Sequence, residues 1–317
     1  AEYVFIDGTQ YAASDFGESK NGAWIPKDPS GLTFGNNGAY LKFESSGALG
    51  NDSSGNNNDF TVTGVAAHDQ MGDSPTFSAT DGNGGNFMTY NEVFKGTGGN
   101  VLSEGNLASS GSGGGTNSGT FGMLTGKWYW ECRAQTVASY GPTFGIGQSG
   151  DPQGANGQNY IITWQTAAGV MFSGGAPTGM GTISVTSTGV TALSSGDILN
   201  FWLDCDNRKL WVGKNGTIPN SGNPATGAYP QASWTTNPTG RYFTCLCENA
   251  SSVGVLNAGQ NPSFNGAITA GTATDKNGFG LFKYDPSGTD FIACCAANIP
   301  ISSQIDPAQT SSDYPQK

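Results

Sequence analysis

The chain has 317 residues, with 13 Lys and Arg against 24 Asp and Glu, a formal net charge of -11 and a pI of about 4.3. Phosphate groups would repel a chain with so few cations and no basic cluster, which excludes a nucleic-acid partner and disfavours an anionic membrane. No apolar run approaches the roughly 20 residues that span a bilayer, so we predict no membrane insertion. Charged residues make up 12% of the chain. Asn, Gln, Ser, Thr and Gly must therefore cover the surface, which suits sugars and protein interfaces.

The glycine content predicts the fold class. The chain contains 50 Gly residues among many Ser, Thr and Asn, which is typical of short strands joined by tight turns. No stretch carries a sustained apolar period of 3.6 residues with caps at both ends. We therefore predict an all-β chain with little helix, long enough to fold on its own core.

The first 86 residues divide into two segments. Strand-like runs in the first segment, residues 1–45, are Tyr3 to Ile6, Gly22 to Ile25 and Ala39 to Phe43. In residues 46–86 the apolar content falls, and one short run, Phe60 to Val65, is expected to form a strand. We predict that residues 1–45 are a β segment and that residues 46–86 are an extended polar connector packed along a neighbour.

The remainder of the chain is predicted to hold one domain. Residues 87–300 carry most of the apolar alternation and are expected to form a β-sandwich. Within this span, Ser109 to Thr116 is rich in Ser and Gly and is expected to be a flexible loop. Residues 301–317 are polar, and we predict a poorly ordered tail.

Residues 126–131 read Gly-Lys-Trp-Tyr-Trp-Glu, the most informative hexapeptide of the chain. In an extended strand Trp128 and Trp130 point to one face, while Tyr129 and Glu131 point to the other. This spacing predicts a half-buried strand that identifies the fold.

Residues 196–216 predict a hairpin. An apolar run from Ile198 to Cys205 is followed by Asp206, Asn207 and Arg208, which are turn-forming residues, and the apolar pattern resumes at Leu210. The Asn-Gly pair at 215 and 216 favours positive φ at the far end.

These blocks resemble the SPRY domain, an antiparallel β-sandwich also found in B30.2 proteins. The resemblance comprises the strand at 126–131, Phe144 to Gly147, the hairpin at 196–216, Val255 to Pro262 followed by Gly278 and Phe279, and Asn298 to Pro300. The motifs follow in order over roughly 180 residues. The resemblance implies a SPRY-like sandwich that binds through the loops at one end.

The N-terminal part resembles an arrangement found in bacteriophage virion proteins. Its motifs are Ala1 to Gly8, Phe16 to Glu18, Gly22 to Lys27, Gly35 to Phe43, Asp52 to Asp59 and Asp73 to Thr76. In those proteins the first motif closes a concanavalin-like (LamG-type) sandwich, and the later motifs lead into a SPRY domain. Since the upstream part of such a sandwich is not in this chain, we expect a fragment or a processed product of a longer protein.

Residues that could carry catalysis have simpler structural roles. His68 is the single histidine, so a nucleophilic triad would have to use it, but it lies in the polar connector and is expected at the surface. Glu131, Asp204, Asp206 and Glu248 are the carboxylates that could support glycoside hydrolysis. Asp204 and Asp206 flank a turn, where Asp normally bonds the local backbone. We therefore predict no catalytic residue.

Metal and redox sites are also not expected. Residues 52–59 offer many oxygen ligands for calcium, but they lack the EF-hand spacing and closing Glu, and they equally fit turn structure. The six cysteines show no Cys-x-x-Cys spacing and fit buried apolar positions in a protein made in a reducing cytoplasm. We predict neither a metal nor a cofactor.

The aromatic residues divide by context. Trp128, Trp130, Trp202 and Trp211 alternate with apolar neighbours and are expected in the core. The aromatic residues in or near Gly, Ser, Asn and Thr-rich segments can instead stack on a sugar or anchor a protein partner. These candidate binding residues are Tyr140, Tyr160, Trp164 and Trp234, and the competing interpretation is that they cap the ends of the sandwich.

Composition and resemblance together suggest a non-enzymatic structural protein of a virion surface, a tail fibre, spike or head fibre, assembled in the host cytoplasm. Its expected partners are other virion proteins and a host-surface glycan or protein, and it is expected to be a homo-oligomer. One alternative is a capsid-decorating or tail-stabilising protein that binds only other virion subunits. Another is a polysaccharide depolymerase.

Overall fold

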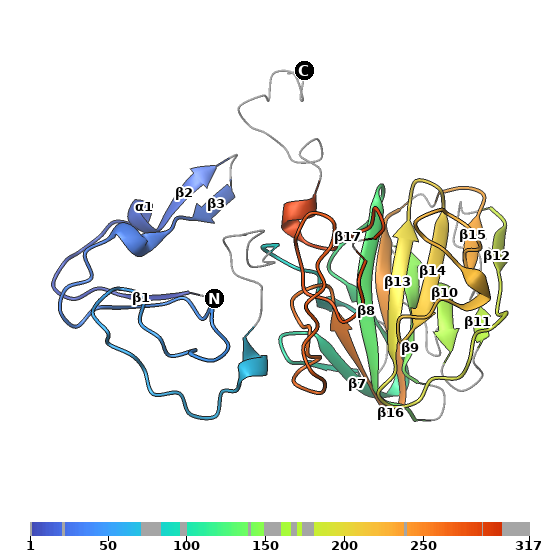
Figure 1. Ribbon diagram of the computed structural model, residues 1–317, viewed down its shortest axis with the longest axis horizontal. Coiled ribbons are helices and arrows are strands. Elements are labelled where there is room, and N and C mark those ends of the chain that lie inside the picture. Colours follow the sequence, from blue (N-terminus) through green and yellow to red (C-terminus); the bar gives the residue numbers. More distant parts are fainter. Residues whose placement is uncertain are drawn as a thin grey trace, which may run out of the picture.

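The structure, a computed structural model, describes residues 2–20, 23–70, 84–95, 100–138, 141–148, 160–165, 170–172, 181–237, 240–286 and 288–299. The N-terminal segment, described over residues 2–20 and 23–70, lies to one side of a large β-sandwich (Figure 1). The predicted tail, residues 301–317, lies outside the described residues.

The N-terminal segment contains two small antiparallel sheets, β1 with β4 and β2 with β3. Its elements are β1 (Tyr3–Phe5), α1 (Ala13–Phe16), β2 (Gly17–Lys20), β3 (Ala23–Pro26), η1 (Pro29–Gly31), β4 (Ala39–Leu41) and η2 (Ala67–Asp69). Each of the three predicted runs thus overlaps a strand. The strand expected at Phe60 to Val65 is not formed. Phe60, Val62 and Val65 stay about half exposed there, so burial does not stabilise a strand.

The large sheet follows the order β11-β10-β9-β16-β8-β13-β14-β15-β12, with β5, β6, β7 and β17 joined to it. Its strands are β5 (Tyr90–Lys95), β6 (Val101–Ser103), β7 (Ala108–Gly119), β8 (Lys127–Thr136), β9 (Thr143–Gln148), β10 (Tyr160–Gln165), β11 (Val170–Phe172), β12 (Ile183–Val185), β13 (Ile198–Asp204), β14 (Lys209–Lys214), β15 (Ala232–Trp234), β16 (Tyr242–Asn257) and β17 (Ile292–Ala293). Two short 3-10 helices, η3 (Pro219–Ser221) and η4 (Ala296–Asn298), lie between or after them. Pairing is antiparallel except between β17 and β8, which confirms the predicted all-β antiparallel class.

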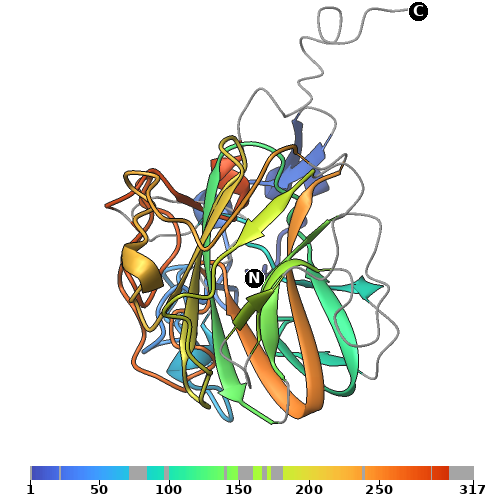
Figure 2. The ribbon, with the colours of Figure 1, turned by 90° about the vertical axis from the view of Figure 1, so that its right-hand side faces the viewer.

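The long strand β16 joins the layers of the sandwich. Along one edge it pairs with β7, and along the other it pairs first with β9 and then with β8. Figure 2 shows these layers on edge, with the covering segment, residues 258–299, on the outside of the β8 layer. The sheet therefore has two buried faces around β8.

The two faces of β8 explain the hexapeptide. Trp128 and Trp130 point into the sandwich, where the Trp130 ring stacks on Phe201 with centroids 5.1 Å apart. Tyr129 points the other way, and its ring centroid lies 4.9 Å from that of Phe282 in the covering segment. The strand is thus buried on both faces rather than half-buried. The core positions predicted for the four tryptophans, Trp128, Trp130, Trp202 and Trp211, are confirmed.

The flexible loop expected at residues 109–116 is wrong, because this run lies inside strand β7. It pairs with β16, with Gly111 opposite Ser252 and Thr116 opposite Cys247. The small side chains let other groups approach closely, and Asn117 donates to the Ser109 hydroxyl at 2.6 Å. A long partner strand therefore outweighs the weak strand preference of Gly and Ser.

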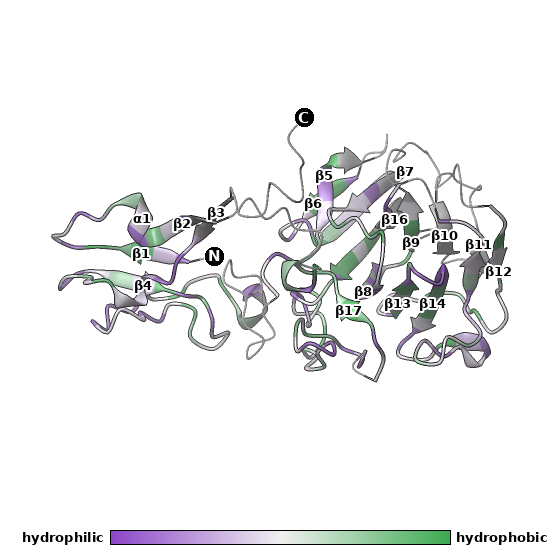
Figure 3. Cartoon of the chain, turned by 90° about the horizontal axis from the view of Figure 1, so that it is seen from above, coloured by the Kyte–Doolittle hydropathy of each residue, from purple (hydrophilic) through white to green (hydrophobic). Residues whose placement is uncertain are grey.

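Figure 3 shows the distribution of hydropathy over the chain, with apolar residues along the strands of the sandwich. At the edge of the domain, the N–H of Met88 donates to the Cys294 carbonyl (2.9 Å), and that of Ala297 donates to the Gly84 carbonyl (3.0 Å). The two ends of the described sandwich are therefore hydrogen-bonded to each other.

Candidate interaction site

Glu131 is a fully buried carboxylate on the covered face of β8. The register places it between Asn200 of β13 and Asn257 of β16. Its Oε1 accepts from the Tyr129 hydroxyl at 2.9 Å, with the Asn200 amide at 3.5 Å, and its Oε2 accepts from the Asn257 amide at 3.1 Å. Three strands are thus linked through one carboxylate.

The same carboxylate fastens the covering segment. The backbone N–H of Tyr284 donates to Oε1 at 2.8 Å, and that of Lys283 donates to Oε2 at 3.0 Å. Burial raises the pKa of Glu131 to about 7, although these hydrogen bonds act to lower it. Both oxygens are occupied by protein donors within the core, so Glu131 serves to fix the fold and does not offer a free carboxylate for hydrolysis.

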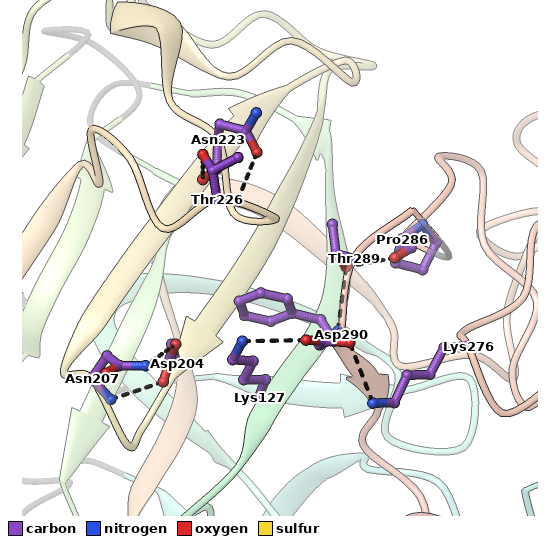
Figure 4. A network of polar contacts seen from close by, with 10 residues as sticks. Lys127, Asp204, Asn207, Asn223, Thr226, Lys276, Pro286, Thr289 and Asp290 are labelled. Atoms are coloured by element: carbon purple, nitrogen blue, oxygen red, sulfur yellow. Dashed lines mark hydrogen bonds and ion pairs between the residues drawn. The ribbon is translucent and has the colours of Figure 1, made fainter.

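The other carboxylates considered for hydrolysis are tied to turns or lie outside the described side chains. Asp204 accepts from the N–H and the side-chain amide of Asn207, both at 2.8 Å (Figure 4). Asp206 accepts from the Gly126 N–H at 3.1 Å. Glu248 lies on β16, and its side chain is outside the described residues. Asp204 thus has the turn role that the sequence predicts, whereas Asp206 bonds a backbone group that is distant in the sequence.

The oxygen-rich segment at 52–59 is organised around Asp52. The N–H groups of Tyr40 (2.8 Å) and Ser54 (2.9 Å) donate to its Oδ1, and that of Asn58 (2.9 Å) donates to Oδ2. Burial acts to raise the pKa of Asp52, but these hydrogen bonds together lower it to about 2. Because N–H donors already occupy the carboxylate, this segment caps β4 instead of presenting free ligands. Within the described residues, no group of three or more His, Cys, Asp or Glu side chains is placed to hold a metal.

The four cysteines whose side chains the structure describes are buried and are not activated as nucleophiles. Cys132, Cys205, Cys294 and Cys295 are buried free thiols, and burial raises the pKa of each. The side chains of Cys245 and Cys247 lie outside the described residues, as does that of His68 in η2. The described thiols therefore behave as small apolar groups.

The structure describes the predicted binding aromatics unevenly. Tyr140 lies outside the described residues, and for Tyr160 and Trp164 only the backbone in β10 is described. Trp234 is 4% exposed, and its Nε1 donates to the Tyr242 hydroxyl at 2.7 Å. The expectation of an exposed ring is therefore wrong for Trp234. Its polar neighbours in the sequence indicate an exposed position, but strand β15 orients this ring into the core.

A more exposed aromatic residue, Tyr229, was not among the predicted candidates. Its side chain is 64% exposed and its φ is +46°, a rare backbone conformation for an aromatic residue. It lies in the Tyr229 loop, residues 215–231, which joins β14 to β15. The signal in the sequence is an aromatic residue between Gly227 and Pro230, in a stretch of small polar residues.

Buried and half-buried side chains hold the Tyr229 loop in place. The Trp211 Nε1 donates to the Ala228 carbonyl at 2.7 Å, and the Lys209 ammonium donates to the Gly227 carbonyl at 2.8 Å. Gln231 is fully buried; its amide donates to Pro219 O at 2.9 Å, and its oxygen accepts from Val212 N at 3.0 Å.

The loop also braces itself internally. Asn223 accepts from the Thr226 N–H at 3.2 Å (Figure 4), and paired backbone bonds join Asn223 to Ala228. A loop held at these points presents Tyr229 with little conformational entropy left to lose on binding. This arrangement can bind a ligand but contains no group suited to bond cleavage.

Comparison with known proteins concerns the fold. No protein-family model matches the chain, and no curated protein matches it. Among solved structures, the SPRY domain of human HERC1 is similar at 15% identity and a TM-score of 0.39, with 53% of this chain and 96% of that one covered. A further human SPRY domain is similar at 12% identity and a TM-score of 0.34, with coverages of 50% and 94%. Likenesses at this level transfer no ligand or partner.

No helix in the described part of the chain is both long enough and apolar enough to cross a bilayer.

Proposed function

We propose that this chain is a non-enzymatic binding protein on the surface of a bacteriophage particle, in a tail fibre, spike or head fibre. Its sandwich presents the Tyr229 loop to a glycan or protein of the host surface. Copies of the chain assemble with one another and with other virion proteins, so weak binding at each loop is multiplied by copy number.

The observation that carries the binding role is the Tyr229 loop itself. Trp211, Lys209 and Gln231 fix a loop from which a single tyrosine projects into solvent. Tyrosine supplies a large apolar contact together with a polar hydroxyl, and it has few rotatable bonds to immobilise. The placement on a virion is supported by the order of motifs in the sequence, from residues 1–8 through residues 73–76.

A second candidate function is capsid decoration or tail stabilisation, in which the chain binds only other virion subunits. It is favoured by apolar side chains that the N-terminal segment exposes, Tyr3 at 46%, Phe5 at 48%, Phe60 at 50% and Val62 at 42%. The ring centroids of Tyr3 and Phe60 lie 6.3 Å apart, so these two exposed rings form one continuous apolar patch. Such a surface suits a packed neighbour better than water.

An adhesion assay tests the binding role. The full chain, displayed on beads at high density, is expected to bind host cells, and Tyr229→Ala should remove most of this binding. Tyr3→Ala removes a similarly exposed tyrosine from the N-terminal segment and serves as the matched control. Equal binding by both variants and the unchanged chain would remove the Tyr229 loop from the proposal.

Electron microscopy of the particle tests the placement. The proposal expects the chain at the tip of a fibre or spike, with the Tyr229 loop facing outward. A lattice-repeated position on the head, with this loop buried against capsid subunits, would instead support decoration.

A further inference from the structure

Two sequence spans that form the surface around Tyr229 contain no charged residue. The span from Asn215 to Trp234 contains no Asp, Glu, Lys, Arg or His, and neither does the span from Gly181 to Gly196. All 24 Asp and Glu residues of the chain lie outside these two spans. We call these two spans the uncharged surface.

The two spans are neighbours in the fold. Strand β12 pairs with β15, and one residue further along, the N–H of Thr186 donates to the Gln231 carbonyl at 2.9 Å. On the other side, a Cβ at Gly189 would lie 3.1 Å from the Pro219 side chain. Residues 186–189 therefore run alongside the Tyr229 loop, and the spans form one surface.

The nearest lysines are used as anchors within this surface. The Lys209 ammonium donates to Gly227 O, while that of Lys214 donates to Ala192 O at 3.0 Å and lies 3.6 Å from Asp197. Both cations are thus engaged with groups of the protein. An anionic ligand would find both of these counter-charges already engaged, and an ionic group that loses water without a partner is disfavoured.

The exposed groups of the uncharged surface are hydroxyls, amides and one aromatic ring. Examples are Ser184, Thr188, Asn220, Asn223, Thr226 and Tyr229. Hydroxyls and amides both donate and accept hydrogen bonds, which matches a polyol, and an aromatic face packs against the C–H groups of a pyranose ring. We infer that the uncharged surface binds a neutral glycan, with Tyr229 stacked on one sugar ring.

A protein partner fits this surface less well. The central residues of protein interfaces are typically several aromatic side chains, Met and Arg, buried over an area of about 800 Å² on each partner. The uncharged surface offers one exposed aromatic side chain, and the remaining exposed groups are small. The inference rests on the proposed role of the Tyr229 loop in binding, and it narrows the ligand class of that site.

Treatment of the host cells separates the ligand classes. Adhesion of the full chain is measured on untreated cells, on cells treated with periodate, which cleaves the vicinal diols of sugars, and on cells treated with protease. In parallel, native gels cast with neutral polysaccharide from the host envelope, or with an anionic polysaccharide, measure retardation of the same protein. Tyr229→Ala, Tyr229→Phe and Tyr3→Ala are run beside the unchanged chain.

A neutral glycan ligand predicts that periodate abolishes adhesion and that protease does not. The neutral gel should retard the chain, with little change between roughly 0.05 and 0.5 M NaCl, because the contacts are uncharged. Tyr229→Ala should weaken binding by about tenfold or more, while Tyr229→Phe and Tyr3→Ala retain it.

Adhesion that depends on Tyr229 but survives periodate and is lost after protease would overturn the glycan inference and leave the proposed binding role intact. Retardation only by the anionic polysaccharide would also overturn it. Adhesion that Tyr229→Ala leaves unchanged would overturn the inference and the binding site together.

Discussion

The buried carboxylate of Glu131 makes the folding stability depend on pH, and one substitution isolates its contribution. In Glu131→Gln the side chain keeps its shape but no longer titrates. An NH2 group replaces one of the two oxygens and then faces N–H donors, for example those of Asn257 and Lys283 at the Oε2 position. The variant is therefore expected to be less stable in absolute terms, and the informative quantity is how its difference from the unchanged protein varies with pH.

The magnitude follows from the shift in pKa. Burial raises the pKa of Glu131 from 4.5 to about 7, a difference of about 2.5 units at 1.36 kcal/mol each, or about 3 kcal/mol. A carboxyl whose pKa is raised in the folded state binds its proton more tightly there than in the unfolded state. The stabilisation is full below pH 4.5 and is lost as the pH rises through 7. Because Glu131 is fully buried, solvent does not screen this effect.

Urea unfolding followed by tryptophan fluorescence, at intervals between pH 4.5 and 8, measures this dependence. Relative to Glu131→Gln, the unchanged protein should lose about 3 kcal/mol of unfolding free energy across this range. Glu104→Gln, a change at an exposed glutamate, controls for the loss of one negative charge. A difference between the two proteins that stays constant with pH would show that the pKa of Glu131 is not raised in the folded protein. So would a gain by the unchanged protein as the pH rises, which would mean that the five donors hold Glu131 as an anion.

Three further predictions concern stability and reactivity. Gly259 has a φ of +127°, and a Cβ there would meet the Phe87 ring at 2.5 Å and Gly280 Cα at 2.6 Å, so Gly259→Ala should cost about 2 kcal/mol or more in chemical denaturation. Gly288→Ala, where a Cβ meets nothing within 4 Å, should change stability by less than about 0.5 kcal/mol, and equal costs would contradict the packing argument. Asp52→Ala leaves the N–H groups of Tyr40, Ser54 and Asn58 without their acceptor, and hydrogen exchange of these amides should speed up by one to two orders of magnitude, for a cost of about 1–3 kcal/mol; unchanged protection would show that the cap is dispensable. Cys132, Cys205, Cys294 and Cys295 should resist a thiol reagent in the folded protein and react on unfolding, as judged by peptide mass mapping, and rapid labelling of any of them in the native state would contradict its burial.

Periodicity in the sequence was sufficient to predict the central strands. Trp128 and Trp130 alternate with Tyr129. In the structure the two tryptophans point to one face of β8 and Tyr129 points to the other, as the spacing requires. The positive φ values of Asn215 and Gly216 also follow from local chemistry, since this residue pair tolerates the left-handed region. These features depend on neighbours in the chain, which a single sequence contains.

The contacts of Glu131 could not be predicted in the same way. They join residues on β8, β13 and β16 with the covering segment, and the partners Asn257 and Glu131 are 126 positions apart. Strand β7 shows the same limit, because its Gly and Ser residues favour a loop until a long partner strand is known to lie beside them. Both outcomes depend on the register between distant strands.

Exposure of the aromatic residues was the least predictable feature of the candidate site. Trp234 and Tyr229 both lie in polar, Gly and Pro-containing sequence, yet one ring is 4% exposed and the other side chain is 64% exposed. The difference arises because β15 pairs with both β12 and β14, which orients Trp234 inward, while Tyr229 falls in the loop just before this strand. Local composition alone does not distinguish the two positions.

Photo-crosslinking from position 229 identifies what the Tyr229 loop contacts on the host surface. A benzophenone amino acid is introduced in place of Tyr229 in the full chain, and in place of the exposed Tyr3 in a control chain, and each is irradiated on host envelopes. A host-surface component joined to the chain from position 229, and absent from the control, is the result predicted for an adhesion site. Crosslinks to host material from position 3 alone, or only to other virion subunits from position 229, would contradict it.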